Sequence, residues 1–228
     1  MKTFRLTPLA AAAAACLTAA AARAQDPAAA AIDRAAQAFR AARTVRATFE
    51  QTLTNPATGT TNTTSGDLAL EQPNRVALRF NNQGGDRVVS DGRTLWVYLP
   101  SAAPGQVMKL PARGTGLQGV ESVSELLASP RAKYAIADGG VATVGGRSAR
   151  VVVLTPKRDG QPVTRARVWV DEQDAAVRQL ELTDANGLVR SMRMTSWTPN
   201  ARLAPSTFTF EVPSGVRVVD RAPGMAGR

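Results

Sequence analysis

The 228-residue sequence contains no histidine, and its only cysteine is Cys16. The absence of histidine removes the commonest general base of enzymes and the commonest metal ligand. Other catalytic motifs are missing as well, since there is no GxSxG elbow, no glycine-rich phosphate loop and no metal-ligand spacing. We therefore expect a protein that is not an enzyme and that uses no metal and no other cofactor.

Aromatic residues are also scarce, at 5% of the chain, and the basic residues are dispersed. Nucleic-acid-binding domains concentrate Lys and Arg in patches and interleave them with aromatic rings that stack on bases. Here arginines such as Arg75, Arg113 and Arg165 stand singly along the chain. The formal net charge of +10 thus predicts a solvated basic surface that attracts acidic partners or membranes, and no nucleic-acid partner.

The first 24 residues have the composition of a secretory signal peptide. They begin with two basic residues and no acid, continue as an alanine-rich run, and end at the small-x-small sequence Ala22-Arg23-Ala24. Alanine is too weakly apolar to favour the alternative, a membrane anchor. Lipidation of Cys16 is disfavoured because the usual leucine three places before it is missing. We expect cleavage after Ala24, export to the periplasm and a mature chain without cysteine.

Two helices are expected in the mature chain. In residues 27–43, apolar side chains such as Ile32, Ala35 and Phe39 recur at spacings of three and four. A second apolar face, with Val123 and Leu127, is expected at residues 120–127, after the glycine-rich segment 114–119 and before Pro130, which should end that helix. Such a short helix could be a movable lid or a plug that caps the core, and the sequence leaves both possibilities open.

From Val45 onward the apolar period changes to two, which predicts about ten or eleven strands joined by tight turns. The pairs Asp91-Gly92 and Asn186-Gly187 mark hairpins. After the second helix, separate strands are expected at residues 134–137 and 140–144, and the last strand is expected at residues 207–210. This pattern is typical of a mainly β fold with some α structure, in one domain over residues 25–220 with a disordered tail at 221–228. The antiparallel sheet either closes on a packed interior or curls around a cavity that the helices partly fill.

Five motifs occur in the same order as in one known family. The most specific is Val-Ser-Asp-Gly-Arg-Thr-Leu-Trp-Val-Tyr-Leu-Pro at residues 89–100. The other four lie at residues 47–51, 66–74, 154–157 and 208–216. Together they resemble the periplasmic outer-membrane lipoprotein carrier protein family (LolA-like) across essentially the whole mature chain.

The resemblance implies a fold and a function. The fold would be a half-barrel, an unclosed and curled antiparallel sheet, with the N-terminal helix and a lid helix over an apolar cavity. The cavity would take up acyl chains of lipoproteins released by an inner-membrane ATP-driven transporter. The carrier, expected to be a monomer, would pass them to an outer-membrane acceptor lipoprotein without any chemical step. Burial of each methylene is worth about 0.8 kcal/mol, so acyl chains do not cross water uncovered.

Motif by motif, the resemblance also implies which residues line the cavity, with ordinary core packing as the alternative for each. These candidates are Phe49, Leu53, Leu68, Leu70, Val76, Leu78, Val123, Leu126, Leu127, Ala166 and Val168. The best-known members have an arginine before the Pro-Asn turn that hydrogen-bonds the lid backbone, whereas this chain has Gln72. Glutamine still donates hydrogen bonds but carries no charge, so the resemblance leaves a lid latch at this position open.

Three other functions remain compatible with the sequence. The first is a lipid-sensing regulatory module, although such regulators usually carry a second domain. The second is a periplasmic carrier of another lipid or apolar molecule. The third is an acceptor tethered to the outer membrane, which would require a lipidated Cys16.

Overall fold

The structure is a computed structural model that describes residues 26–112 and 121–220. The predicted signal peptide, the glycine-rich segment 114–119 and the tail at 221–228 lie outside these residues. The helices of the described part are α1 (Pro27–Ala41), α2 (Glu121–Ala128), α3 (Pro130–Lys133) and the 3-10 helix η1 (Pro205–Phe208). The strands are β1 (Thr44–Asn55), β2 (Thr60–Glu71), β3 (Arg75–Phe80), β4 (Arg87–Asp91), β5 (Thr94–Tyr98), β6 (Gln106–Pro111), β7 (Tyr134–Val144), β8 (Arg147–Pro156), β9 (Val163–Asp171), β10 (Val177–Asp184), β11 (Val189–Pro199) and β12 (Arg217–Asp220).

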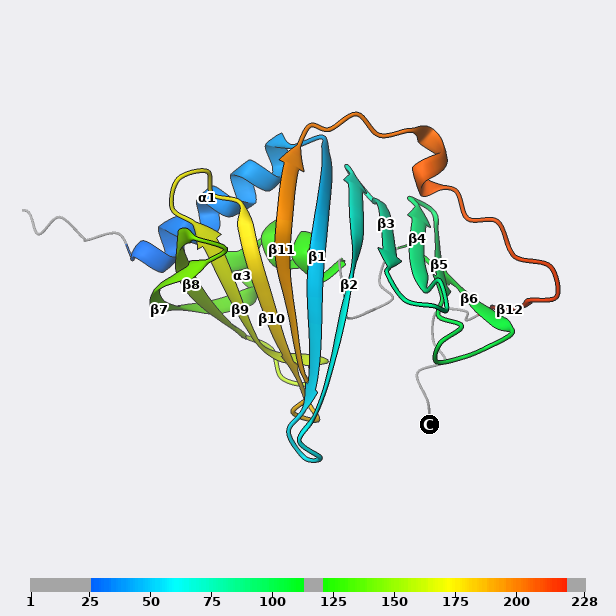
Figure 1. Cartoon of the computed structure of the whole chain (residues 1–228). Coiled ribbons are helices and arrows are strands. Elements are labelled where there is room, and N and C mark those ends of the chain that lie inside the picture. Colours follow the sequence, from blue (N-terminus) through cyan, green and yellow to red (C-terminus); the bar gives the residue numbers. More distant parts are fainter. Residues whose placement is uncertain (1–25, 113–120, 221–228) are drawn as a thin grey trace, which may run out of the picture.

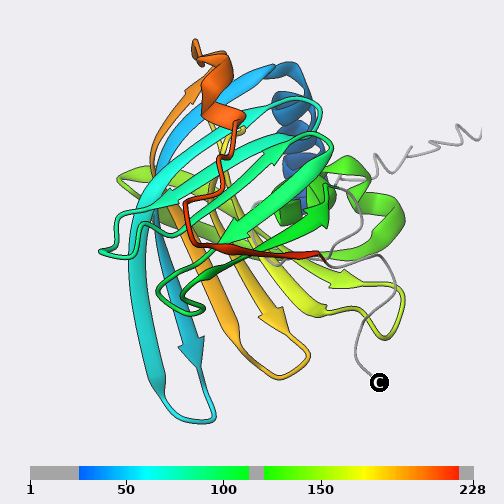
Figure 2. The ribbon, with the colours of Figure 1, turned by 90° about the vertical axis from the view of Figure 1, so that its right-hand side faces the viewer.

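These strands form one twelve-stranded sheet in the order β12-β6-β5-β4-β3-β2-β1-β11-β10-β9-β8-β7. All neighbours pair antiparallel except β12, which runs parallel to β6. The two edge strands, β7 and β12, do not pair with each other, so the sheet stays unclosed. Figures 1 and 2 show it curling around the side on which α1 lies. The predicted half-barrel is confirmed.

Helix α1 covers the concave side of the sheet over β7, β8 and β9 (Figure 1). It begins at Pro27, and the Asp26 carboxylate caps it by accepting the backbone N–H of Ala28 at 3.0 Å. Its buried face, with Ile32 and Ala35 at its centre, has mostly alanine side chains, so the helix axis lies close to the sheet. Within the described residues, no helix combines the length and the apolar composition that crossing a membrane requires.

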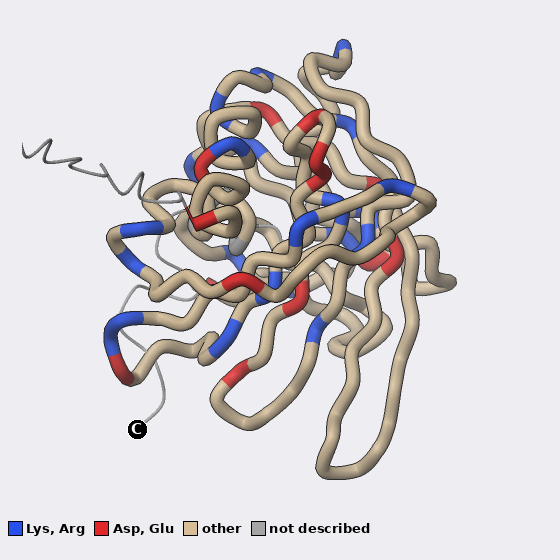
Figure 3. The backbone as a smooth tube through the Cα atoms, turned by 90° about the vertical axis from the view of Figure 1, so that its left-hand side faces the viewer, with Lys and Arg blue, Asp and Glu red and all other residues tan. Residues whose placement is uncertain are grey.

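The convex side of the sheet carries charged residues of both signs. Along the backbone, Lys and Arg are interspersed with Asp and Glu (Figure 3). Several form cross-strand ion pairs, such as Arg193 with Glu50 at 2.5 Å and Arg167 with Glu181 at 3.4 Å. Each such exposed pair contributes little stability, but together they keep this side of the sheet hydrated.

The predicted final strand at residues 207–210 is wrong. Pro205 starts the 3-10 helix η1, and Phe208 then turns its ring into a cluster with Ala69 and Ala77 on the convex side. The alternation of Thr and Phe therefore reflects the packing of an irregular segment on the sheet. The last strand is β12 instead, and its neighbour β6 was also not predicted.

Two boundaries around the second helix also differ from the prediction. Pro130 does more than end α2, because it occupies the first turn of the separate short helix α3, where proline is favoured. The two strands expected at 134–137 and 140–144 form the single strand β7, with an irregularity in pairing between Asp138 and Val141.

One buried carboxylate ties together the ends of β8, β9 and β10. Asp171 is 0% exposed and accepts hydrogen bonds from Arg147, from Arg178 Nε at 2.9 Å and from the Gln173 N–H at 2.8 Å. Burial alone would raise the pKa of the Asp171 carboxyl, but these hydrogen bonds hold it far below its ordinary range. The ionised form is therefore part of the fold at neutral pH.

Asp171→Asn should lower the free energy of unfolding by about 3 kcal/mol at pH 7, because two guanidinium groups lose their charged partner. The pKa of this carboxyl is lower in the folded than in the unfolded chain, so its contribution is complete above the unfolded pKa. It is lost as the pH falls below about 4 toward the folded pKa. Urea unfolding between pH 7 and pH 2 should show wild type and variant converging.

The control is Asp174→Asn, since that carboxylate binds the same two arginines but is 47% exposed. It should change stability by less than about 1 kcal/mol. A difference between wild type and Asp171→Asn that is independent of pH would contradict the assignment.

Candidate functional site

The concave side of the sheet is apolar, and strand register decides which residues it contains. Ala47 of β1 lies opposite Leu68 of β2, which in turn lies opposite Leu78 of β3. Because side chains alternate along a strand, the residues two positions away fall on the same side. We call the resulting group the strand cluster, and it contains Ala42, Val45, Ala47, Phe49, Leu68, Leu70, Val76, Leu78, Met192 and Met194.

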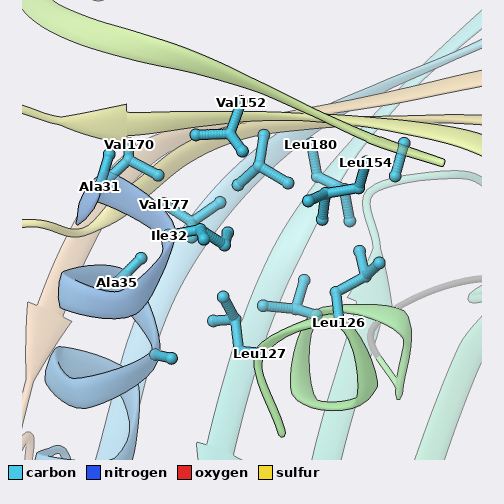
Figure 4. Packing of buried hydrophobic residues seen from close by; sticks show 14 of the residues in the cluster. Ala31, Ile32, Ala35, Leu126, Leu127, Val152, Leu154, Val170, Val177 and Leu180 are labelled. Atoms are coloured by element: carbon cyan, nitrogen blue, oxygen red, sulfur yellow. The ribbon is translucent and has the colours of Figure 1, made fainter. Parts of the chain in front are cut away.

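A second group, the helix cluster, joins α1 and α2 to β8, β9 and β10. Figure 4 shows Leu126 and Leu127 of α2 facing the valines of the sheet beside Ile32 of α1. The helix cluster contains Ala28, Ala31, Ile32, Ala35, Ala36, Val123, Leu126, Leu127, Val152, Leu154, Ala166, Val168, Val170, Val177, Leu180 and Leu182. Phe39, near the end of α1, packs against both clusters and links them.

The structure brings ten of the eleven predicted candidates into these two clusters. Five lie in the strand cluster and five, including all three of α2, lie in the helix cluster. Leu53 is the exception, because it is only partly buried and belongs to neither. It lies four residues beyond Phe49 along β1, where the apolar side of the sheet is more open. A role of these residues in ligand binding stays a prediction.

Phe49 is the largest side chain of the strand cluster and is 1% exposed. Its ring meets Phe80 edge-on, with centroids 5.6 Å apart and planes at 88°. The ring crosses β2 at Gly66, where an added Cβ would lie 2.9 Å from Phe49 Cζ and 2.2 Å from the Arg79 carbonyl oxygen. Glycine at this position therefore makes room for the ring, which explains a glycine inside a strand.

A cavity of about 200 Å³ remains between α1, α2 and the ends of β10 and β11. Of the predicted candidates, Val123 and Leu127 line it, together with Phe39 and Trp197. Pockets for small molecules usually measure about 300–1,000 Å³. In this structure the helices thus lie directly on the sheet, and most of the predicted lining is in contact with other side chains.

Polar contacts hold the helices at their rim. The Gln72 amide Nε2 donates to the Phe39 carbonyl oxygen at 3.2 Å, so this hydrogen bond goes to the last turn of α1 and not to α2, the helix for which a lid was one expectation. Arg131 of α3 forms an ion pair with Asp33 of α1 at 2.5 Å. Lys157 at the end of β8 donates to the Arg131 carbonyl oxygen at 2.8 Å. These contacts are exposed, whereas apolar contacts hold the centre of the helix layer.

Sequence reasoning missed three residues of the same side, Met192, Met194 and Arg190 on β11. The first two alternate into the strand cluster opposite Gln51 and Phe49 of β1. Methionine side chains are flexible and adapt to irregular apolar partners. The alternation was visible in the sequence, but the pairing of β11 with β1 was needed to place it.

The convex side has its own groove, of about 560 Å³, between β3, β4 and the segment 206–214. Phe210 of that segment stacks on Trp96 at 5.4 Å, and the Arg87 guanidinium lies 4.9 Å from the Phe210 ring. Arg79 lies opposite Arg87 in the strand register, and these two arginines line the groove together with Glu211. It contains none of the predicted candidates.

Comparisons with known proteins agree on one family. The model of the family described as Outer membrane lipoprotein carrier protein LolA matches residues 40–211. An outer-membrane lipoprotein carrier protein from Chromobacterium violaceum is 28% identical over 177 residues, which cover 78% of this chain and 81% of the relative. One of the same name from Albidiferax ferrireducens is 27% identical over 186 residues, covering 77% and 84%.

A solved structure supports the fold. The crystal structure of an uncharacterized conserved protein from Thermus thermophilus superposes with a TM-score of 0.55 at 14% identity. The superposition covers 85% of this chain and 99% of that protein. At this identity the likeness concerns the fold alone.

The difference between Phe49 and Leu53 can be measured. Phe49→Ala should lower the free energy of unfolding by about 3–5 kcal/mol, because it leaves a cavity in the strand cluster. Leu53→Ala should cost less than about 1 kcal/mol, since the side chain is only partly buried. Urea unfolding of both variants checks this. Equal losses would mean that Leu53 is a core residue.

Proposed function

The chain belongs to the outer membrane lipoprotein carrier protein family, and from that premise we propose that it carries lipoproteins across the periplasm by holding their acyl chains against its concave side. The observation that supports this most directly is the apolar concave side of an unclosed sheet. Two helices cover part of it through alanine, valine and leucine contacts. The protein binds and releases its cargo without chemistry.

Acyl chains enter only if the helices shift, because the cavity of about 200 Å³ is smaller than most ligand sites. The shift exposes the apolar face of α2, including Leu126 and Leu127, and the valines beneath it. An acyl chain then covers the same surface that the helix leaves. The apolar area removed from water changes little in this exchange, so binding stays reversible, as a carrier that must release its cargo requires.

The partners follow from this role. The mature chain, cleaved after Ala24 and folded as one domain over residues 25–220, is a periplasmic monomer. It takes lipoproteins from an ATP-driven transporter of the inner membrane and delivers them to an acceptor lipoprotein of the outer membrane. The excess of basic residues, +7 without residues 1–24, favours contact with acidic membrane or protein surfaces.

The direct test is to purify the protein from the periplasm and identify bound ligands by mass spectrometry. Acylated proteins among them support the proposal, whereas free lipids alone would indicate a carrier of another lipid. The intact mass of the protein gives the N-terminus in the same experiment. A diacylated Cys16 would refute a soluble carrier and indicate a tethered acceptor.

Gln72 gives a kinetic prediction. Gln72→Ala removes the donor to the Phe39 carbonyl and should speed the release of a bound fluorescent acyl probe by about two- to tenfold, as expected for one hydrogen bond. Gln72→Arg offers more donors to the same helix end and should slow release. Stopped-flow displacement measures both rates.

The control for these variants is Gln83→Ala, which removes an exposed amide from the turn between β3 and β4. It should leave release unchanged. If all three variants release the probe at the wild-type rate, the contact between Gln72 and α1 does not control opening.

A further inference from the structure

Arg190 of β11 is a charged residue that lies among apolar side chains on the concave side of the sheet. Along β11, Arg190 shares its side with Met192 and Met194 of the strand cluster. In register it lies between Leu53 of β1 and Leu182 of β10. Leu182 belongs to the helix cluster, so Arg190 has apolar neighbours on both adjacent strands.

The guanidinium of Arg190 is incompletely paired. Its Nε is buried and has no hydrogen-bond partner within the part of the chain that the structure describes. Burial lowers the pKa of this guanidinium, and the nearby charge of Asp184 offsets the effect only in part. The Asp184 carboxylate already accepts the N–H groups of Asn186 and Leu188, at 2.8 and 2.9 Å. A buried donor without an acceptor destabilises the fold unless something else supplies the acceptor.

Two other arginines on β10 and β11 are paired with carboxylates. Arg193, three residues further along β11, points to the opposite side and forms an ion pair with Glu50 at 2.5 Å. Arg178 on β10 binds Asp171 through Nε at 2.9 Å. The fold thus provides carboxylates for arginines elsewhere on these two strands, which makes the unpaired Nε of Arg190 informative.

A second unpaired polar atom lies on the same side. The hydroxyl oxygen of Thr64 on β2 is buried and has no hydrogen-bond partner among the described residues. Thr64 is opposite Gln51 of β1, which is opposite Met192 of β11. Gln51 and Leu53 are both only partly buried. Thr64 and Arg190 therefore flank the more open end of the apolar side.

We propose that Arg190 forms a polar subsite on the concave side, which binds the anionic oxygen of an acylated ligand, a carboxylate or a phosphate, while the acyl chain lies on the apolar clusters. This inference rests on the proposed function, because it requires acyl chains to bind there. The guanidinium donates to the anion, and Leu53, Leu182 and Met192 contact the first methylenes of the chain. Thr64 adds a hydroxyl that faces the same region.

The test compares three ligands that share a fourteen-carbon chain: tetradecanol, tetradecanoate and tetradecyl phosphate. Each displaces an apolar fluorescent probe from the purified mature chain. Wild type should bind at least one of the anions about tenfold more tightly than the alcohol, as expected for a charge-assisted hydrogen bond. The anion that is preferred tells a carboxylate subsite from a phosphate subsite.

Variants test whether Arg190 causes the preference for anions over the alcohol. Arg190→Gln should bind the anions within about twofold of the alcohol, with the affinity for the alcohol unchanged, and Arg190→Lys should keep part of the preference. Arg193→Gln is the matched control, because it removes the same charge from the opposite side of the same strand. It should behave as wild type. Thermal unfolding verifies that each variant is folded, and Arg190→Gln should not lower Tm, since it removes an incompletely paired group.

The outcomes separate this inference from the proposed function. If wild type binds all three ligands equally, the subsite is refuted and acyl binding stands. If none of the three displaces the probe, acyl binding itself is refuted. If Arg190→Gln keeps the preference for anions, or if Arg193→Gln loses as much of it as Arg190→Gln does, the preference comes from the overall charge of the protein. Either result would refute the subsite.

Discussion

The curled sheet has an apolar concave side, and water in contact with that side is unfavourable by about 25 cal/mol for each Å². Helix α1 covers it over β7, β8 and β9, and α2 packs beside α1 in the helix cluster. The strand cluster, centred on Phe49, contains side chains of four strands and Ala42 but none from α2. The two clusters therefore differ in how they are covered, and Phe39 is the side chain that links them.

This difference suits a carrier. A core that is formed by strands alone keeps its shape when a helix moves, because strand pairing is independent of the helix layer. The paired strands β1, β2 and β11 hold the strand cluster in place, and the Asp171 ion-pair group holds the ends of β8, β9 and β10. The helix layer, in contrast, contacts the sheet through apolar side chains and a few exposed polar groups. Under the proposed function, the sheet provides the stability and the helices move to let the cargo in and out.

Much of the fold could be predicted from local pattern. The spacing of Ile32, Ala35 and Phe39 indicated α1, and Asp91-Gly92 indicated the hairpin of β4 and β5. Pairing between distant segments could not be predicted, because no local signal joins β12 to β6, where Arg217 lies beside Gln106. The wrong prediction of a strand around Phe208 has a related cause. Its alternation with threonine resembles a strand, and only the position of Ala69 and Ala77 beneath it explains the aromatic ring.

For the candidate site too, local features could be predicted from the sequence, whereas features that depend on distant segments could not. Alternation and resemblance together placed ten of eleven candidates in the two clusters, since facing direction is a local property. They could not show that these side chains contact one another closely, because that depends on how near α1 and α2 come to the sheet. Nor could they distinguish Arg190 from the other arginines of the chain. Its position in the sequence is ordinary, and its significance comes from the neighbours that β1 and β10 supply. A buried donor among apolar side chains limits which ligands fit there, so under the proposed subsite the choice of cargo depends on strand pairing that only the folded sheet creates.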